Sequence, residues 1–313
     1  MNKMMFQFAA LAIAATSTTT AMATPTSAGI SKAASGRLPA VLACLQKQKT
    51  AIVVAHRGGP LAEHPENAIV TFDYTTSLAP VFLEVDVQQT VDDVLFLEHD
   101  GVLERTTTGT GAISDKFSIE VEMVKQRDPF ATPTGYTPPR LADALAWSKG
   151  RAILILDIKP RTDAALVAKE VKAAGLQASV ITNVYTIKQA LAVRAVLPDA
   201  VLAMAIGTQD AFDQAKAAGL VGPQIIAFTP LGKTGNPIAR DLKALGATSI
   251  TGSFFGPETA DAKYRTIKDA PLYQNLLASG AELILSNRPL DAVNALSADP
   301  AYWDKLKACG VGD

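Results

Sequence analysis

Histidine, cysteine and aromatic residues are scarce in this sequence. Its 313 residues include three histidines and two cysteines, and Phe, Trp and Tyr together make up 6% of the chain. Charge of either sign is not in excess, because 29 Lys and Arg residues face 30 Asp and Glu residues. This balance excludes a basic nucleic-acid-binding protein and a polybasic membrane-surface protein, and the 48% of apolar residues excludes a disordered tail. The composition is that of a globular protein, long enough to bury a core without disulfides or metals.

The N-terminal apolar run is too short for a clear membrane span. It extends over residues 4–15, whereas a spanning helix needs about 20 apolar residues. One Lys precedes the run, and a Thr/Ser stretch and residues 21–23 (Ala-Met-Ala) follow it, which is typical of a secretory signal peptide. We expect residues 1–23 to be this signal peptide and residues 24–37 a flexible leader, so the mature protein would be exported, to the periplasm or as a secreted protein. An uncleaved anchor is the alternative.

The two cysteines lie near opposite ends of the predicted domain. Cys44 precedes the first apolar strand, and Cys309 lies just before the C-terminus. Export would permit a disulfide between them. In a closed barrel the first and last elements are neighbours, so this bond would stabilise the fold by about 4–5 kcal/mol in the entropic description. Two buried free thiols are the alternative.

Short β-branched runs alternate with Ala-, Leu-, Lys- and Glu-rich stretches, which predicts a parallel sheet with crossover helices. Nine stretches are predicted strands: 51–55, 81–87, 94–98, 152–158, 179–183, 201–206, 224–228, 249–252 and 282–286. We predict one α/β domain over residues 38–313, a distorted (β/α)₈ TIM barrel, because about 250 residues is the usual size of that fold. Residues 88–93 are too few for a crossover between the second and third parallel strands, so we expect the distortion there.

Acidic residues alternate with apolar ones on two predicted strands. Glu84 and Asp86 are two positions apart and therefore share one face of a strand. Asp157 ends another apolar strand, and Lys159 follows on the same face. Carboxylates that face an apolar interior repel each other, and a divalent cation removes this penalty. We expect Glu84, Asp86 and Asp157 to hold one Mg²⁺ or Ca²⁺, because these ions prefer oxygen ligands. A buried ion pair of Asp157 with Lys159 is the alternative.

Two histidines lie where predicted strands end. His56 and Arg57 follow the first strand, and His99 ends the third. In a TIM barrel the carboxyl ends of the strands carry the active site. Imidazole can transfer a proton at neutral pH, and a guanidinium can bind an oxyanion. We expect these three residues in the active site, with a purely structural role as the alternative for His56.

A short polar block, residues 64–68, precedes a predicted helix. Pro65 is ordinary at a helix start. We expect Glu66 and Asn67 to orient the site residues or to contact phosphate, because the neighbouring motifs contain candidate catalytic and metal-binding residues. His64 is expected to be a loop residue.

Together these blocks resemble the glycerophosphodiester phosphodiesterase family of the PLC-like phosphodiesterase superfamily. The family pattern runs His-Arg-Gly, Pro-Glu-Asn-Thr, Glu-x-Asp, His-Asp-x-x-Leu-x-Arg-Thr-Thr and Glu-x-Lys. The chain is similar to it, in the same order, at residues 56–58, 65–67, 84–86, 99–107 and 157–159. The resemblance is close from residue 51 to about 160 and returns at residues 286–289, which are similar to the family's Thr-Asp-x-Pro ending.

The chain departs from the family pattern at three places. Ala68 replaces the usual Thr. Asp157 replaces the usual Glu, which gives an Asp-x-Lys similar to that of the related sphingomyelinase D type enzymes. The late-strand Trp-Thr-Val-Asn is missing, and residues 249–255 occupy that region. The third departure leaves one wall of the pocket without a family precedent.

The resemblance implies metal-dependent hydrolysis of glycerophosphodiesters to glycerol 3-phosphate and an alcohol. His56 and His99 would be the general acid and base, in an order that the sequence leaves open. Arg57 and Lys159 would bind the phosphate. The partner would be a small phosphodiester, with no nucleic acid and no stable membrane anchor.

Two other functions remain as alternatives. A lysophospholipid or sphingolipid headgroup phosphodiesterase would need an apolar groove, for which Phe130, Tyr136, Phe254 and Phe255 are the candidates. An exported protein that binds a glycerophosphodiester without cleaving it is the other.

Overall fold

A computed structural model describes residues 37–228 and 237–311. The predicted signal peptide, residues 1–23, lies outside these residues, as does all of the predicted leader except its last residue. Within the two described stretches, no helix combines the length and the apolar character needed to cross a membrane.

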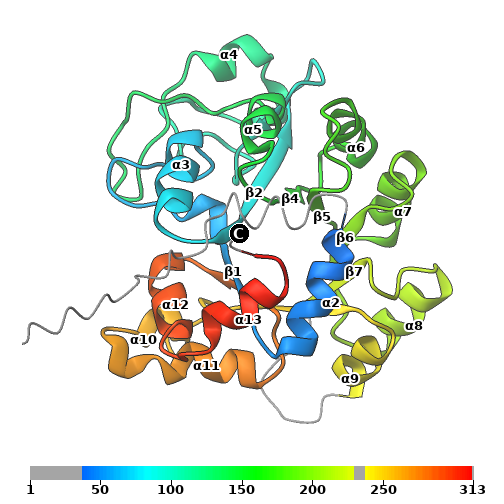
Figure 1. Ribbon diagram of the computed structural model, residues 1–313. Coiled ribbons are helices and arrows are strands. Elements are labelled where there is room, and N and C mark those ends of the chain that lie inside the picture. The colour runs from blue at the N-terminus through cyan, green and yellow to red at the C-terminus, as the bar shows by residue number, and fades with distance from the viewer. Residues whose placement is uncertain (1–36, 229–236, 312–313) are drawn as a thin grey trace, which may run out of the picture.

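Eight parallel strands close into a barrel (Figure 1). They are β1 (Ile52–Ala55), β2 (Val81–Gln89), β4 (Leu154–Ile158), β5 (Val180–Asn183), β6 (Val201–Ala205), β7 (Ile225–Phe228), β8 (Thr248–Gly252) and β9 (Leu283–Ser286). Val53 of β1 pairs with Ile284 of β9 on one side and with Val81 of β2 on the other, and these two pairings close the ring. The prediction of a distorted TIM barrel is thus confirmed.

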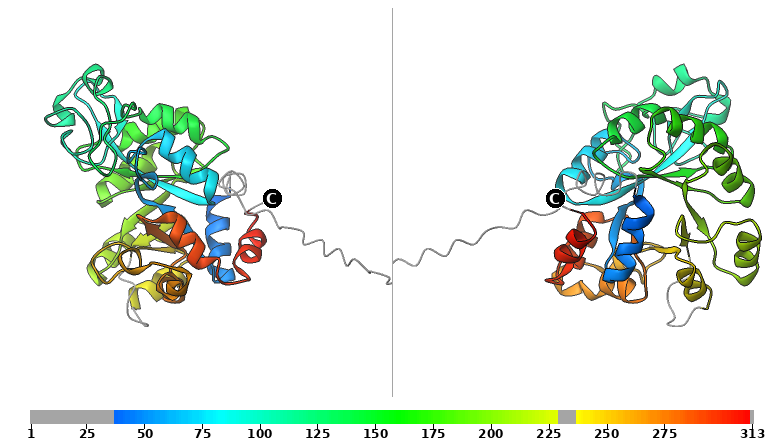
Figure 2. Two further views of the ribbon diagram at one scale, coloured as in Figure 1. Left: turned by 90° about the vertical axis from the view of Figure 1, so that its left-hand side faces the viewer. Right: turned by 45° about the vertical axis from the view of Figure 1, so that its right-hand side comes forward.

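The third of the nine predicted strands, residues 94–98, lies outside the ring of eight. It is β3 (Leu95–Leu97), which pairs antiparallel with the end of β2, where Val87 lies opposite Leu97. The short connection permits a hairpin but no crossover, which explains the distortion. The segment after β3, with α4 (Ser118–Glu122), forms a lobe beside the barrel (Figures 1 and 2). This lobe has a small apolar core of Phe96, Leu103, Ile113 and Val121.

Helices cover the outside of the barrel (Figure 2). The longer ones after β1 are α3 (Ile69–Leu78), α5 (Leu141–Ser148), α6 (Ala164–Ala173), α7 (Ile187–Val196), α8 (Gln209–Ala217), α9 (Pro237–Ala244), α11 (Pro271–Ala278) and α12 (Pro289–Leu296). Side chains cap three of them, because Asp163, Thr186 and Thr208 each accept a hydrogen bond from a first-turn N–H. A proline begins α11 and α12, where its missing N–H costs nothing.

The first and last described helices are joined. Before β1, α2 (Leu38–Gln48) lies beside the final helix, α13 (Tyr302–Ala308) (Figure 1). A disulfide connects Cys44 of α2 to Cys309, and their Cα atoms are 5.5 Å apart. The bond therefore encloses nearly the whole barrel, because its two cysteines are 265 positions apart.

Candidate active site

One cavity of about 350 Å³ lies at the carboxyl ends of the barrel strands. Its polar lining contains seven of the residues singled out in the sequence: His56, Arg57, Glu84, Asp86, His99, Asp157 and Lys159. They come together because β1, β2 and β4 are neighbours in the ring, and the β2–β3 hairpin returns His99 to the same edge. We call this the active-site cavity.

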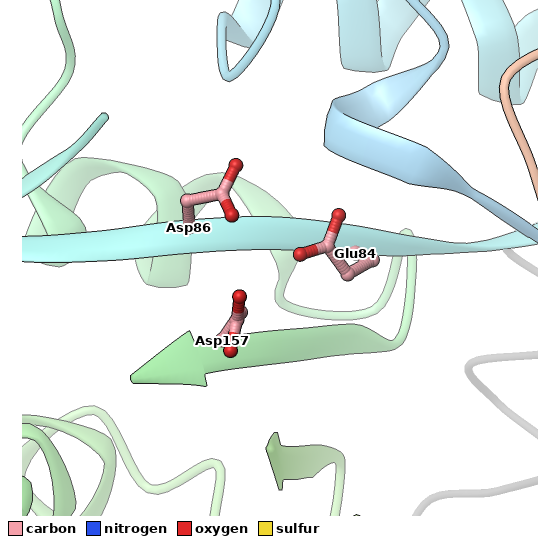
Figure 3. Close-up of side chains that lie close together, drawn as sticks. All are labelled: Glu84, Asp86 and Asp157. Carbon is pink, nitrogen blue, oxygen red and sulfur yellow. The ribbon is translucent and has the colours of Figure 1, made fainter. Parts of the chain in front are cut away.

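Three buried carboxylates line the active-site cavity, and Figure 3 shows that they lie close together. Glu84 and Asp86 lie on β2 and Asp157 lies on the adjacent strand β4, and one oxygen of each lies within 4.8 Å of the others. Strand register explains the contact, because Asp86 and Asp157 are direct partners across β2 and β4. Burial, together with the charges of Asp86 and Asp157, raises the pKa of Glu84 well above its ordinary value. The cluster is an acidic, oxygen-only site that fits a divalent cation.

Lys159 offsets part of this negative charge. Its Nζ lies 2.6 Å from Asp86 Oδ1 and 2.6 Å from Asp157 Oδ2. Although burial alone would lower it, these two carboxylates raise the pKa of Lys159 above its ordinary value, so the ammonium stays charged. The buried ion pair of Asp157 with Lys159 is therefore present together with the acidic cluster.

Two further residues, which sequence reasoning missed, hold Asp157. Asn183 Nδ2 donates to Asp157 Oδ1 at 2.9 Å, and the Tyr185 hydroxyl donates to Oδ2 at 2.7 Å. Both residues lie at the carboxyl end of β5, and this position was the only signal in the sequence that could have marked them.

Asn67 and Glu66 support the site from behind. Asn67 Nδ2 donates to Asp86 Oδ2 at 2.7 Å, and the Asp86 N–H donates back to Asn67 Oδ1 at 3.0 Å. Glu66 accepts two hydrogen bonds from Arg57 Nη1, both at 3.1 Å, and two from Arg105. The guanidinium of Arg57 is thus held by a carboxylate, while its backbone N–H donates to Glu84 at 2.9 Å.

His56 has a neutral partner and an aromatic neighbour. Its Nδ1 lies 2.6 Å from Asn287 Oδ1, and its ring stacks on Phe254 with centroids 4.4 Å apart. Because an amide oxygen only accepts, Nδ1 carries the proton and Nε2 is left as an acceptor, 3.9 Å from Glu84 Oε2. Burial lowers the pKa of His56, which favours the neutral ring.

His99 has a charged partner instead. Its Nδ1 lies 2.6 Å from Asp100 Oδ1. Arg105 donates to the same carboxylate at 2.6 and 3.0 Å, and these bonds hold the pKa of Asp100 at about 2. Beneath them, Glu98 accepts from the Thr106 hydroxyl at 2.7 Å and from the His99 N–H at 3.0 Å.

Other candidates lie elsewhere. His64 bonds the Ala62 carbonyl at 3.0 Å and packs on Tyr74, as a loop residue does. Phe254 and Phe255 line the active-site cavity, but Phe130 and Tyr136 do not. The prediction for the last two was wrong, because they belong to the lobe that follows the β2–β3 hairpin.

The sequence is similar to a known family and to several curated proteins. The model of the glycerophosphoryl diester phosphodiesterase family matches residues 56–205. The glycerophosphodiester phosphodiesterase of Caldanaerobacter subterraneus is 41% identical over 69 residues, or 22% of this chain and 28% of that protein. The enzyme of the same name from Bacillus altitudinis is 31% identical over 108 residues, or 34% of this chain and 44% of that protein. The chain therefore matches less than half the length of these curated relatives.

Solved structures match over a longer stretch. A glycerophosphoryl diester phosphodiesterase from Parabacteroides distasonis has a TM-score of 0.71 and 28% identity, over 82% of this chain and 90% of that one. A phosphodiesterase from Oleispira antarctica, in complex with the product sn-glycerol-3-phosphate, shares the fold with a TM-score of 0.63 and 18% identity, over 80% and 99% of the two chains. Together with the ordered motifs around one cavity, these matches make the chain similar to the glycerophosphoryl diester phosphodiesterase family, whose model covers residues 56–205.

Proposed function

We propose that the protein hydrolyses a glycerophosphodiester to glycerol 3-phosphate and an alcohol. The observation that carries this proposal is the active-site cavity, where two histidines with differently charged partners lie beside three carboxylates and Lys159. The product complex of the Oleispira phosphodiesterase, which has the same fold, supports the choice of substrate.

The three carboxylates would hold one divalent cation, Mg²⁺ or Ca²⁺. Their donor set fits, because Glu84, Asp86 and Asp157 offer only oxygen atoms, all within 4.8 Å of one another. Such a cation, when bound, supplies positive charge that stabilises a phosphate oxygen. Lys159 and Arg57 add fixed positive charge to the same cavity, and Asn67 holds Asp86 in place.

The two histidines would divide the proton transfers. His56 is the base, because its neutral amide partner Asn287 leaves Nε2 free to accept a proton. His99 is the acid, because the Asp100 carboxylate at its Nδ1 is a negative partner for a protonated ring. Proton transfer of this kind accelerates a reaction by roughly 10²–10⁴-fold for each group.

Product analysis tests the function. Purified protein is incubated with glycerophosphocholine, and glycerol 3-phosphate and choline are quantified. We expect His56→Ala and His99→Ala each to lower kcat by about 10²-fold or more. His64→Ala is the matched control, because this ring lies outside the cavity, and it should retain wild-type activity. Tight binding of the substrate by wild-type protein without product would support the binding-protein alternative instead.

A lysophospholipid headgroup phosphodiesterase is the second candidate. Phe254 and Phe255 give the active-site cavity an apolar wall, and Phe255 is 71% exposed. A wall of this kind offers contact to an alkyl chain. A kcat/KM that is higher for lysophosphatidylcholine than for glycerophosphocholine, and that falls in Phe255→Ala only for the lipid, would favour this candidate.

We also propose that the protein is exported. The N-terminal 23 residues have the pattern of a signal peptide, and a disulfide joins Cys44 to Cys309. Expression of the full chain in a Gram-negative host, followed by fractionation and N-terminal sequencing, should yield a periplasmic protein that begins after Ala23. A cytoplasmic protein with an intact N-terminus would contradict export.

A further inference from the structure

A further buried carboxylate, outside the acidic cluster, lies next to residues that contact His56. Asp261 of the short helix α10 (Ala260–Lys263) is 7% exposed. Its Oδ1 accepts hydrogen bonds from the hydroxyl groups of Ser253 at 2.6 Å, Tyr273 at 2.8 Å and Ser286 at 2.9 Å. Its Oδ2 accepts from the backbone N–H of Asn287 at 2.7 Å. One carboxylate thus ties together three segments that are distant in the sequence.

Two of these segments contact His56. Asn287, whose N–H bonds Asp261, accepts the His56 Nδ1 proton with its side-chain oxygen at 2.6 Å. Ser253, whose hydroxyl bonds Asp261, directly precedes Phe254, and the Phe254 ring stacks on the imidazole with an interplanar angle of 18°. Asp261 therefore fixes both the hydrogen-bond partner and the stacking partner of His56.

The turn after β9 is held from a second direction as well. Arg288 donates from Nη1 to the carbonyl oxygens of Asp261 at 3.1 Å and Tyr264 at 2.8 Å, and its N–H donates to the Ser286 hydroxyl at 2.9 Å. The carboxylate of Asp261 accepts hydrogen bonds from Ser253, which follows β8, from Tyr273 of α11 and from Ser286 of β9. Loss of the Oδ2 acceptor would leave the Asn287 N–H without its hydrogen bond to Asp261. Of the bonds that Asp261 accepts, this one involves the residue whose side chain contacts His56.

We propose that Asp261 is a positioning residue, which sets the orientation and the Nδ1–H tautomer of His56 through Asn287 and Phe254. This proposal rests on the proposed function only for its catalytic consequence, since His56 is the base there. A hydrogen bond that fixes the orientation of an imidazole also decides which nitrogen faces the reacting group.

Ring ¹⁵N NMR of the full chain without ligand tests the tautomer directly. The sequence has three histidines, so comparison with His64→Ala and His99→Ala assigns the signals of His56. Asp261→Asn is the informative variant, because its amide oxygen can keep the three hydroxyl donors while its NH₂ cannot accept from Asn287. Above the titration of the ring, we expect wild-type His56 to be protonated at Nδ1 and the variant to show a mixture with the Nε2–H form. We also expect kcat to fall by about 10-fold or more while KM stays within about twofold.

Glu282→Gln is the matched control. Glu282 is also a buried carboxylate beside β9, but it lies at the opposite end of the strand, where it accepts from Lys243 at 2.6 Å and from the Ser249 N–H at 2.8 Å. This variant should lose thermal stability and keep the wild-type His56 signals and kcat. If the role of Asp261 were purely structural, Asp261→Asn and Glu282→Gln would show the same His56 ring signals and the same kcat.

Wild-type ring signals and wild-type kcat in Asp261→Asn would overturn the proposal. If Asp261→Asn does not fold, Asp261→Ser decides in its place, because it lacks the Oδ2 atom that accepts from the Asn287 N–H. Unchanged His56 signals in folded Asp261→Ser would then overturn the proposal equally. If wild-type protein cleaves no glycerophosphodiester, the proposed function fails, but the NMR comparison still tests the positioning role.

Discussion

Asp86 and Asp157 lie directly opposite each other on the paired strands β2 and β4, and one ammonium group lies 2.6 Å from both. This relationship makes Lys159 part of the acidic cluster rather than a neighbour of it. Two of the three buried carboxylates therefore share one positive charge that the chain itself supplies. Glu84, the third, receives an N–H from the Arg57 backbone but no ammonium contact of this kind.

Removal of the ammonium should destabilise the protein. Lys159→Met leaves two buried carboxylates without their cation, and breaking a buried pair in this way costs about 3–5 kcal/mol. Urea unfolding of wild-type and variant protein at pH 7, in the presence of chelator, measures the loss. Lys263→Met, which removes an exposed lysine, is the control and should change the free energy of unfolding by less than about 1 kcal/mol. Equal losses in the two variants would contradict the role assigned to Lys159.

Activity should depend on a divalent cation held by the carboxylates. Chelation should abolish product formation, and Mg²⁺ or Ca²⁺ should restore it. Asp157→Asn should raise the cation concentration needed for half-maximal activity by about 10-fold or more, because the site loses one charged ligand. Asp304→Asn, an exposed residue of α13, is the control. If the chelator left product formation unchanged, the three carboxylates would not bind a cation that the reaction requires.

A charged partner for His56 should shift the pH dependence of activity. Burial lowers the pKa of His56, and its Asn287 partner is neutral. Asn287→Asp places a negative charge at Nδ1, which stabilises the protonated ring and raises its pKa. Because a base must be neutral to act, the acidic limb of the kcat/KM profile should move to higher pH. A limb that stays in place, or that moves equally in the exposed control Asn275→Asp, would count against His56 as the base.

Glu98 should make stability fall as pH rises. Burial raises its pKa to about 8 in the folded protein, against about 4.3 in the unfolded chain. The protonated side chain therefore contributes fully below pH 4 and the contribution is lost as pH rises to 8. Glu98→Gln keeps the shape without the charge, so its stability relative to wild type should increase over this range and stay constant above it. Unfolding at several pH values measures the difference, and a difference that does not change with pH would refute the prediction.

The disulfide should stabilise the barrel without contributing to the reaction. It closes a loop of 265 positions, and replacement of both Cys44 and Cys309 by Ser should lower the free energy of unfolding by about 2–5 kcal/mol. The active-site cavity does not include either cysteine, so kcat should be unchanged in folded protein. Denaturant unfolding with and without a reductant checks the prediction. A reductant that leaves the wild-type midpoint unchanged would contradict it.

The sequence by itself determined the barrel and the polar residues at its rim. A strand such as 81–87 and the motif residues at its end are local patterns that the sequence shows directly. Because the carboxyl ends of the strands meet at one face of any TIM barrel, these patterns also predict which polar residues come together. The sequence determined the position of β3 only in part. The short connection before it excluded a crossover helix, but it did not predict that β3 would pair antiparallel with β2 outside the ring. Only the tertiary structure decided that Glu66 holds Arg57, that Tyr185 holds Asp157, and that Asn287 meets His56. The last pair is 231 positions apart, and no local spacing reports a contact that exists only because β9 closes the barrel against β1.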